Sequence, residues 1–434
     1  MESLLRELRR RKAEFEVDDM AVVPAGDALT ISRYAKWIHH GYHGTMNYLD
    51  NAELRKNPSS VLSDVQSMLI VVLSQKRLEK ESGERGNISR PQMSFPRPPL
   101  LSSNEDGTDN PAPNPDNLIP KKADFLNQDS IKIQGTTGQI IHYAGLIDYH
   151  QNFRNKLRKI GSFIKERITS FHGRGVVDTA PILEKEWAVR AGLGTIGRHS
   201  LLIHPVWGSR VFLGTLLLSI PVSLLASEDE IPQPFPLSVP QDEKKLPLNP
   251  RLTSQSGLSS VPTHSQIKTV SDTKSDSVSI TPVSSDQINP VSNEIPAVLP
   301  QAECCRYCRR CIEVCPTGAI HEKPYGTLEA RRCLNYWTIE YKEDFLPPSI
   351  SETIGKHLIG CDLCQQVCPQ NKRENYPPIT IPLAEVQQMT EEMFQQRFSS
   401  TIIHRVGLER LKRNANWIFE SNQNKKKDQQ EEEQ

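Results

Sequence analysis

Two cysteine-rich stretches decide the fold of this chain: CCRYCRRCIEVCP at residues 304–316 and CDLCQQVCP at residues 361–369. All nine cysteines of the protein lie between Cys304 and Cys368. The first stretch contains the spacing C-x2-C-x2-C-x3-C-P, and the second contains C-x2-C-x3-C-P. Runs of thiolates with this spacing, each ending before a proline, are typical of proteins that bind a pair of 4Fe–4S clusters.

The spacing also predicts which cysteines share a cluster, because the last Cys of each run ligates the other cluster in two-cluster proteins. Four thiolates are therefore expected around the first cluster: Cys305, Cys308, Cys311 and Cys368. Three more are expected around the second: Cys315, Cys361 and Cys364. The second run is one cysteine short, since Leu358 stands at the expected position. We assign the fourth ligand to Cys333, because Cys304 adjoins a ligand of the first cluster and can hardly reach the second.

Zinc and disulfide bonds are two other uses of closely spaced cysteines. Eight thiolates could hold two zinc ions, but structural zinc sites usually pair two separate C-x2-C knuckles. Disulfides are disfavoured because such closely packed positions do not suit independent bridges. A triple run that ends in x3-C-P therefore favours iron–sulfur clusters over both alternatives.

Length and charge exclude several classes of protein. With 434 residues, the chain has room for two or three domains. The 52 basic residues balance the 52 acidic ones, so no global field draws the protein to nucleic acid or to a membrane. No apolar run reaches the length of a membrane span. The basic run at residues 9–12 lacks the apolar core of an export signal, so we expect a reducing cytoplasm.

The hydrophobic pattern predicts an α+β fold. Short apolar runs predict strands at residues 68–73, 175–178, 200–204 and 211–220. Helical periodicity predicts helices at residues 1–16, 153–164, 182–191 and 381–420. Composition divides the chain into segments. A sheet-and-helix domain is expected at 1–220, with a disordered insertion at about 75–134, and a low-complexity linker follows at 221–300. The rest is expected to form a ferredoxin-like two-cluster domain at 301–376, a short helical region at 377–424 and a charged tail at 425–434.

One motif in the chain matches a dinucleotide-binding fingerprint by its letters alone. Gly192, Gly194 and Gly197 have the G-x-G-x-x-G spacing. That fingerprint belongs after a strand and at the start of a helix, whereas here a helical pattern precedes it and a strand pattern follows. The glycines are better explained by a tight helix-to-strand turn, or by close approach of the backbone to another flat ligand.

Several blocks together resemble the epoxyqueuosine reductases, cobalamin-dependent iron–sulfur enzymes that act on tRNA. The blocks are HGTM (43–46), YAGLIDYH (143–150), VDTAPILE (177–184), RAGLGTIGRHSLLIH (190–204), FLG (212–214), RRCLNYWTIE (331–340) and GCDLCQQVCPQN (360–371). The resemblance covers most of the chain outside the two low-complexity segments. The chain departs from the family in those segments, in the residues before Asp148, which are usually more basic, and in a C-terminal region that looks short.

The resemblance implies two-electron reduction of epoxyqueuosine at the wobble position of the tRNA anticodon, by cobalamin fed from two 4Fe–4S clusters. It implies a monomer that receives electrons from an external one-electron donor, such as flavodoxin or ferredoxin. Asp178 is expected to donate the proton that the departing oxygen needs, which requires a raised pKa. By sequence alone, Asp178 could instead cap the following helix.

The resemblance also implies binding residues. Cobalamin contacts are expected from Met46, Tyr48, Arg55, His199, Leu202, Asn335 and Asp362. Because apolar residues that enter a helix often belong to the core, Met46 and Tyr48 both have that second explanation. Contacts with tRNA phosphates are expected from Arg405, Arg410 and Arg413, although an ordinary solvated helix face would have the same pattern.

Two other functions use the same cofactor signals. A reductive dehalogenase has the same cofactor set but usually carries an export signal. An electron carrier of the ferredoxin type needs the clusters alone, so it does not explain the large N-terminal region.

Overall fold

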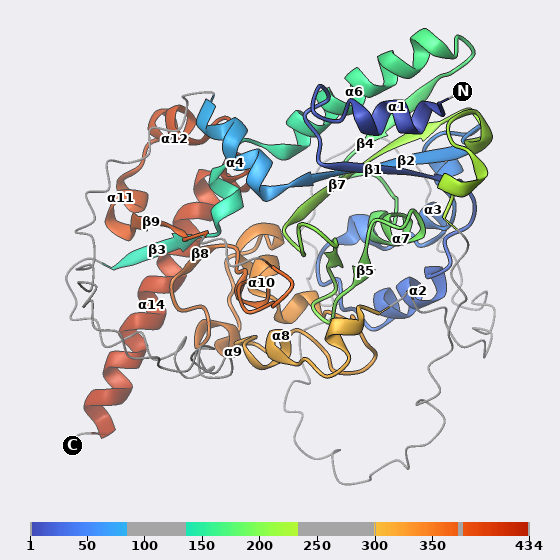
Figure 1. The fold of residues 1–434 in the computed structure, drawn as a ribbon. Coiled ribbons are helices and arrows are strands. Elements are labelled where there is room, and N and C mark those ends of the chain that lie inside the picture. The colour runs from blue at the N-terminus through green and yellow to red at the C-terminus, as the bar shows by residue number, and fades with distance from the viewer. Residues whose placement is uncertain (1, 85–135, 233–298, 300, 372–375, 433–434) are drawn as a thin grey trace, which may run out of the picture. The chain divides into compact units, whose positions relative to one another are not determined.

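The computed structural model describes residues 2–84, 136–232, 299, 301–371 and 376–432. These described residues belong to one compact unit. Most of the predicted insertion and most of the predicted linker lie outside the described residues. The described part mixes helices and sheets, as the hydrophobic pattern predicts (Figure 1).

A four-stranded antiparallel sheet forms the centre of the N-terminal part. Its strands follow the order β1 (Asp19–Pro24), β2 (Ser67–Ser74), β7 (Val211–Leu218) and β4 (Gly173–Val176). All eight residues of β2 are buried, which explains why its sequence is a continuous apolar run. In the register of β2 and β7, Ile70 lies opposite Thr215 and Val71 lies opposite Gly214.

Helices cover both faces of this sheet because alternate strand residues point in opposite directions. Helices α1 (Leu4–Arg10) and α6 (Tyr149–Arg167) pack against one face of the sheet, to which Val71 of β2 and Leu216 of β7 belong. Helix α7 (Glu184–Arg190) packs against the other face, where Trp187 contacts the core that includes Ile70. Figure 1 shows α1 and α6 on the side of the sheet opposite to α7.

The remaining N-terminal elements frame the space beside α7. They are α2 (Ile31–His39), α3 (Glu53–Lys56) and a short hairpin of β5 (Thr195–Ile196) and β6 (Leu202–Ile203). Just after β6, His204 and Gly208 pair with each other in an isolated β-bridge.

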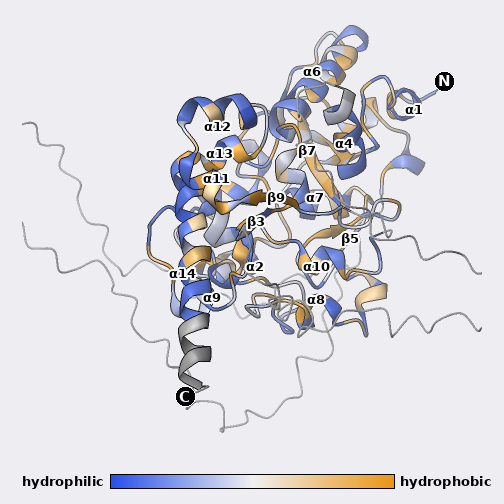
Figure 2. Ribbon diagram, turned by 90° about the vertical axis from the view of Figure 1, so that its left-hand side faces the viewer, coloured by the Kyte–Doolittle hydropathy of each residue, from blue (hydrophilic) through white to orange (hydrophobic). Residues whose placement is uncertain are grey.

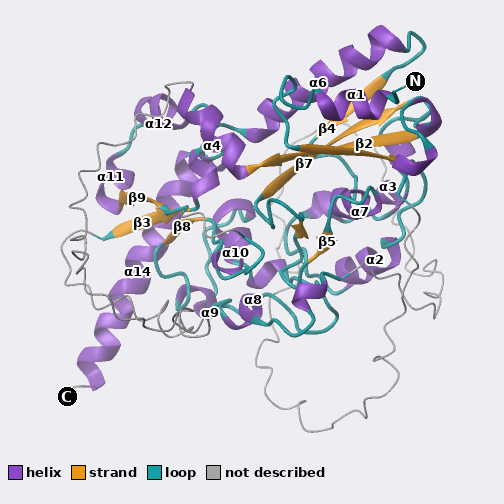
Figure 3. Ribbon diagram, viewed as in Figure 1, coloured by secondary structure: helices purple, strands orange, loops and turns teal. Residues whose placement is uncertain are grey.

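The cysteine segment contains the short α-helices α8 (Arg310–Glu313), α9 (Pro348–Ser351) and α10 (Leu363–Gln366), which Figure 3 shows among long loops. A second sheet has the order β8 (His357–Ile359), β3 (Thr137–Ile140) and β9 (Ile379–Pro382). Four helices follow: α11 (Leu383–Gln388), α12 (Glu391–Phe398), α13 (Ile403–Val406) and α14 (Leu408–Glu432). Figure 2 shows that β9 is hydrophobic while α12 is largely hydrophilic, as expected if this sheet packs inside the helices.

Three predicted boundaries are wrong. The predicted insertion starts too early, because α4 (Gln75–Glu84) continues directly from β2 and buries Leu78 completely. The predicted linker also starts too early, since residues 221–232 are described, Leu225 is buried, and Arg6 forms an ion pair with Asp229. At the C-terminus, β9 occupies part of the predicted helical region, and α14 continues into the predicted charged tail.

Candidate active site and cysteine segment

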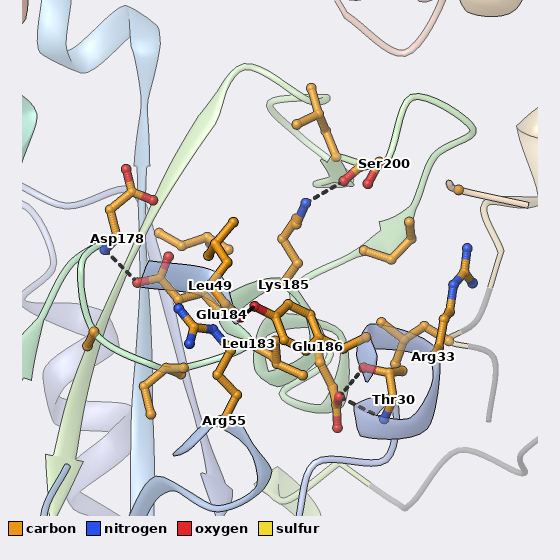
Figure 4. A pocket seen from close by; sticks show the side chains of 18 of the residues that line it. Thr30, Arg33, Leu49, Arg55, Asp178, Leu183, Glu184, Lys185, Glu186 and Ser200 are labelled. Atoms are coloured by element: carbon orange, nitrogen blue, oxygen red, sulfur yellow. Dashed lines mark hydrogen bonds between the residues drawn. The ribbon is translucent and has the colours of Figure 1, made fainter. Parts of the chain in front are cut away.

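A cavity of about 460 Å³ lies where α2, α3, α6, α7, the β5–β6 hairpin and β7 meet. Its apolar lining includes Leu49, Ile182, Leu183, Leu201, Val211 and Leu213. Its polar lining includes Arg33, Arg55, Asp178, Glu184, Lys185 and Ser200. Figure 4 shows Asp178 beside Glu184, with Lys185 reaching toward Ser200. The size and the mixed lining are typical of a small-molecule or cofactor site.

Asp178 lies at the centre of a hydrogen-bond network in this cavity. Its Oδ2 accepts a hydrogen bond from the Tyr149 hydroxyl and lies 3.3 Å from His150 Nε2. Its backbone N–H donates to Glu184 Oε1 at 2.9 Å. Asp178 has a φ of +60°, a strained conformation for a residue other than glycine that is often found at functional sites. Because Leu183 is the N-cap residue of α7 and has no side-chain cap bond, the helix-cap explanation of Asp178 is wrong.

The network extends from Asp178 to the C-terminal helices. His150 Nδ1 lies 2.7 Å from Asp148 Oδ1, and Arg405 Nε donates to Asp148 Oδ2 at 2.7 Å. The Tyr149 ring stacks on His150 at a centroid distance of 4.1 Å. Four charged side chains, from Arg405 to Asp178, therefore form one continuous chain of contacts.

The expected raised pKa of Asp178 is not found. Burial raises it, but the hydrogen bonds from His150 and Tyr149 outweigh that effect, and the pKa falls below its usual value. Burial lowers the pKa of His150, but its two carboxylate partners outweigh burial and raise it. Burial and the nearby charge of Asp178 raise the pKa of Glu184 to about 8. The pKa values of the two carboxyl groups therefore move in opposite directions, with that of Asp178 lowered and that of Glu184 raised.

The structure brings the cysteines together in the two groups that the spacing predicts. Cys305, Cys308, Cys311 and Cys368 line one small cavity together with Cys304. Burial raises the pKa of Cys364, and the neighbouring thiols Cys361, Cys333 and Cys315 raise it further. All nine cysteines are free, so no disulfide forms. Within the described residues, no three Cys, His, Asp or Glu side chains are placed to bind a single metal ion.

Tyr143 packs behind the large cavity, against its lining residue Phe212, which it contacts edge-on at a centroid distance of 5.6 Å. It is packed against the core beneath α1 and α6 and against the core of the C-terminal part. Burial raises the pKa of Tyr143, and charges on Asp178, Asp362 and Cys333 raise it further. The same side chain is thus close to the carboxylate network and to a cysteine of the second group.

The predicted cobalamin contacts divide into residues near the cavity and residues away from it. Arg55 lines the cavity, and Tyr48 lies close enough to Asp178 for that charge to raise its pKa, after burial, to about 12. Met46 packs against the core of the C-terminal part instead. Leu202, the first residue of β6, is 3% exposed and packs in the core, whereas Leu201, in the turn just before β6, lines the cavity.

Three more of these residues lie in or beside the cysteine segment. His199 lines the cavity of the first cysteine group, and burial lowers its pKa to about 4. Asn335 accepts a hydrogen bond from the backbone N–H of Cys361. Asp362 accepts one from Gln366 Nε2 at 2.6 Å. These contacts stabilise the cysteine loops, and none of the three residues lines the large cavity.

The structure also corrects the predicted tRNA contacts. Arg413 is 8% exposed and donates to the backbone carbonyls of Trp337, Tyr341 and Glu343, so its guanidinium is not presented to a phosphate. Arg410 likewise donates to three backbone carbonyls. Arg405 is exposed but bonded to Asp148.

Glu184 and Tyr149 belong to the site, although they are not among the residues predicted from the sequence. Glu184 is the first residue of α7, six positions after Asp178, and this short separation at a strand-to-helix turn was a usable signal. Tyr149 follows the N-cap residue Asp148 of α6, so the start of that helix aims it and His150 at Asp178.

Comparisons with known proteins give consistent results. Residues 304–371 match a family model described as a 4Fe-4S double cluster binding domain, and residues 119–179 match one described as Epoxyqueuosine reductase QueG, DUF1730. The epoxyqueuosine reductase of Escherichia coli is 31% identical over 308 residues, which cover 69% of this chain and 60% of that protein. That of Atelocyanobacterium thalassa is 25% identical over 396 residues, covering 89% of this chain and 88% of that protein. The chain thus spans less than two thirds of the E. coli relative.

Solved structures share the fold. An epoxyqueuosine reductase from Streptococcus thermophilus has a TM-score of 0.59 at 19% identity, covering 96% of this chain and 80% of that one. A structure of epoxyqueuosine reductase with an epoxyqueuosine-modified tRNA stem loop has a TM-score of 0.58 at 19% identity, covering 95% and 80%.

Proposed function

This chain is related to the epoxyqueuosine reductases, and from that premise we propose that it reduces the epoxide of epoxyqueuosine, at the wobble position of a tRNA anticodon, to queuosine. The observation that carries the proposal is one cavity that is lined both by Asp178 of a carboxylate–histidine network and by Phe212, which packs against Tyr143 close to Cys333 of the second cysteine group. Deoxygenation of an epoxide to an alkene consumes two electrons and two protons and releases water. The cysteine groups are the candidates for supplying the electrons, and the carboxylate–histidine network is the candidate for supplying the protons.

The chain has a binding domain for two 4Fe–4S clusters. We assign Cys305, Cys308, Cys311 and Cys368 to one cluster and Cys315, Cys333, Cys361 and Cys364 to the other. The donor set fits this role, because thiols packed together raise one another's pKa and need a cationic centre before they can ionise. Each cluster passes one electron at a time, so an external one-electron donor must supply two in turn.

The large cavity fits part of a cobalamin. A corrin is a wide apolar ring that carries amide side chains, and the cavity offers apolar walls from Leu201, Val211 and Leu213 with a charged rim at Arg55 and Lys185. When bound, cobalamin supplies a cobalt centre that accepts electrons one at a time and delivers two to the epoxide.

The proton network then acts on the departing oxygen. We assign Asp178 to the transfer, with His150 as its source, because His150 bridges two carboxylates and holds a proton that Asp178 can pass on. Tyr149 fixes the Asp178 carboxylate, and Glu184 fixes its backbone. General acid catalysis of this kind contributes about 10² to 10⁴ in rate.

The proposal also includes the enzyme's compartment, its oligomeric state and its contact with tRNA. Among the described residues, no helix is both long enough and apolar enough to cross a bilayer. We propose a cytoplasmic monomer that contacts tRNA in part through Arg405, whose side chain remains 41% exposed.

The decisive experiment combines cofactor analysis with turnover. Anaerobically purified protein is expected to contain about eight irons and one corrin per chain, and to remove one oxygen atom from epoxyqueuosine-modified tRNA, as measured by mass spectrometry. Clusters without a corrin and without turnover would overturn the proposal in favour of an electron carrier. Turnover of a halogenated organic compound without turnover of tRNA would overturn it in favour of a dehalogenase.

A further inference from the structure

The turn of the β5–β6 hairpin separates the two cavities. Ile196, Ser200 and Leu201 line the large cavity. His199, in the middle of the same turn, lines the small cavity formed by Cys305, Cys308, Cys311 and Cys368. One short turn therefore contacts the candidate reaction site on one side and the first cysteine group on the other.

His199 carries a buried hydrogen-bond donor on the cysteine side. The residue is 3% exposed, and its Nδ1 accepts a hydrogen bond from the backbone N–H of Leu201 at 3.3 Å. A ring nitrogen that accepts such a bond has no proton, so the ring proton must be on Nε2. Within the described structure, His199 Nε2 is fully buried and has no hydrogen-bond partner. An unsatisfied buried donor costs about 1–3 kcal/mol, so this atom is placed for a partner that the protein itself does not supply.

The neighbours of His199 hold the ring in place. A Cβ at Gly197 would lie 2.6 Å from His199 Cε1, so only glycine leaves space for the ring there. Arg198 donates to the backbone carbonyls of Cys305 and Arg306, each at 3.0 Å, and ties the turn to the first cysteine loop. The third glycine of the G-x-G-x-x-G motif thus acquires a structural reason unrelated to a dinucleotide.

We propose that His199 donates an Nε2–H···S hydrogen bond to the 4Fe–4S cluster held by Cys305, Cys308, Cys311 and Cys368, and thereby raises the reduction potential of that cluster. The inference rests on the cluster assignment in the proposed function. The direction follows from charge, because a hydrogen-bond donor stabilises the reduced cluster, which carries one more negative charge, more than the oxidised one. His199 is thus a tuning residue for electron transfer.

The test measures the reduction potential of each cluster in the iron-loaded full-length protein by an EPR-monitored redox titration. His199→Leu removes the donor at similar volume, and His199→Gln keeps an N–H donor. His204→Gln is the matched control, because His204 is an equally buried histidine of the same region that bonds Asp19 and does not line the cysteine cavity. In His199→Leu, the ratio of reduced to oxidised first cluster at a fixed potential is expected to fall at least threefold. His199→Gln is expected to recover most of the loss, and His204→Gln is expected to behave as the natural protein.

An unchanged potential of both clusters in His199→Leu, with full iron content, would overturn the inference. If that variant loses its first cluster, resonance Raman spectra of the natural protein in H2O and D2O decide the question. An N–H···S bond predicts a shift of the iron–sulfur stretching bands on exchange that His199→Gln alters, and identical shifts in both proteins would refute it. A natural protein without iron would instead contradict the cluster assignment in the proposed function, so the two failures are distinguishable.

Discussion

The cysteine segment and the large cavity are built in opposite ways. Every cysteine lies between residues 304 and 368, and the two groups follow from the two spaced runs, with Cys333 as the one member that lies in neither run. The cavity instead takes its lining from segments between Thr30 and Gly326. Local spacing is visible in a sequence, whereas a site assembled from many segments needs the fold before its members can be identified. Substitutions in the cysteine segment and substitutions in the cavity therefore test the two sites separately.

The largest expected effect comes from the one cysteine that the spacing does not fix. Cys333→Ser is expected to lower the iron content from about eight to about four per chain and to abolish turnover, because the second cluster loses a ligand. The measurement is iron and sulfide content together with conversion of modified tRNA.

Cys304→Ser is the matched control, because Cys304 is exposed and is spare in the ligand assignment. It is expected to keep about eight irons and full turnover. The reverse result, with four irons lost in Cys304→Ser and none in Cys333→Ser, would show that the second ligand set is wrong.

The next effect tests the proton network of the cavity. Asp178→Asn keeps the size of the side chain but removes its capacity to carry a proton, so turnover is expected to fall by about 10² to 10⁴. Iron content should not change, because the hydrogen bonds and ion pair of Asp178 in the described structure involve no cysteine. Asp229→Asn, an exposed surface carboxylate paired with Arg6, serves as the control. Turnover within twofold of the natural protein in Asp178→Asn would exclude the proton-transfer role.

These two sites also show how much the sequence could predict. The apolar runs of β2 and β7 and the periodicity of α6 predicted those elements, because burial alone dictates their patterns. The cavity residue Leu201 was missed in favour of Leu202, since the apolar pattern does not show that the turn ends, and β6 begins, between these two leucines. Arg413 resembled a surface cation because its carbonyl partners lie more than sixty residues earlier in the sequence. Spacing could not reveal either fact.

A smaller effect is expected at the far end of the network. Arg405→Gln removes the cation that holds Asp148, so Asp148 and His150 lose part of their orientation toward Asp178. Turnover is expected to fall by about 3- to 10-fold, as for loss of a positioning contact. Arg397→Gln is the control, since Arg397 pairs with Glu385 on the C-terminal helices and has no contact with the network.

The same variant separates two roles of Arg405. If Arg405 acts through His150, the pH profile of turnover shifts because Asp148 no longer holds the histidine as firmly, while the affinity for tRNA stays the same. A weaker affinity for tRNA with an unchanged pH profile would show that Arg405 contacts a phosphate instead.

The smallest effect concerns stability and comes from Glu184. Its pKa is about 8 in the folded protein against an ordinary value of 4.5, so the fold favours the neutral acid. The corresponding stability is fully present below about pH 4.5 and is lost as the pH rises through 8. Glu184→Gln stays neutral throughout, so its stability relative to the natural protein should increase from pH 5.5 to pH 8.5, by about 1–2 kcal/mol once screening by water is allowed for.

Thermal unfolding of the cofactor-loaded protein at the two pH values measures the difference, with the exposed Glu228→Gln as the control. Because the charge of Asp178 is one cause of the raised pKa, the same substitution in an Asp178→Asn background should show a smaller increase. An equal increase in both backgrounds would mean that burial alone raises the pKa, and that the two carboxyl groups of the cavity titrate independently.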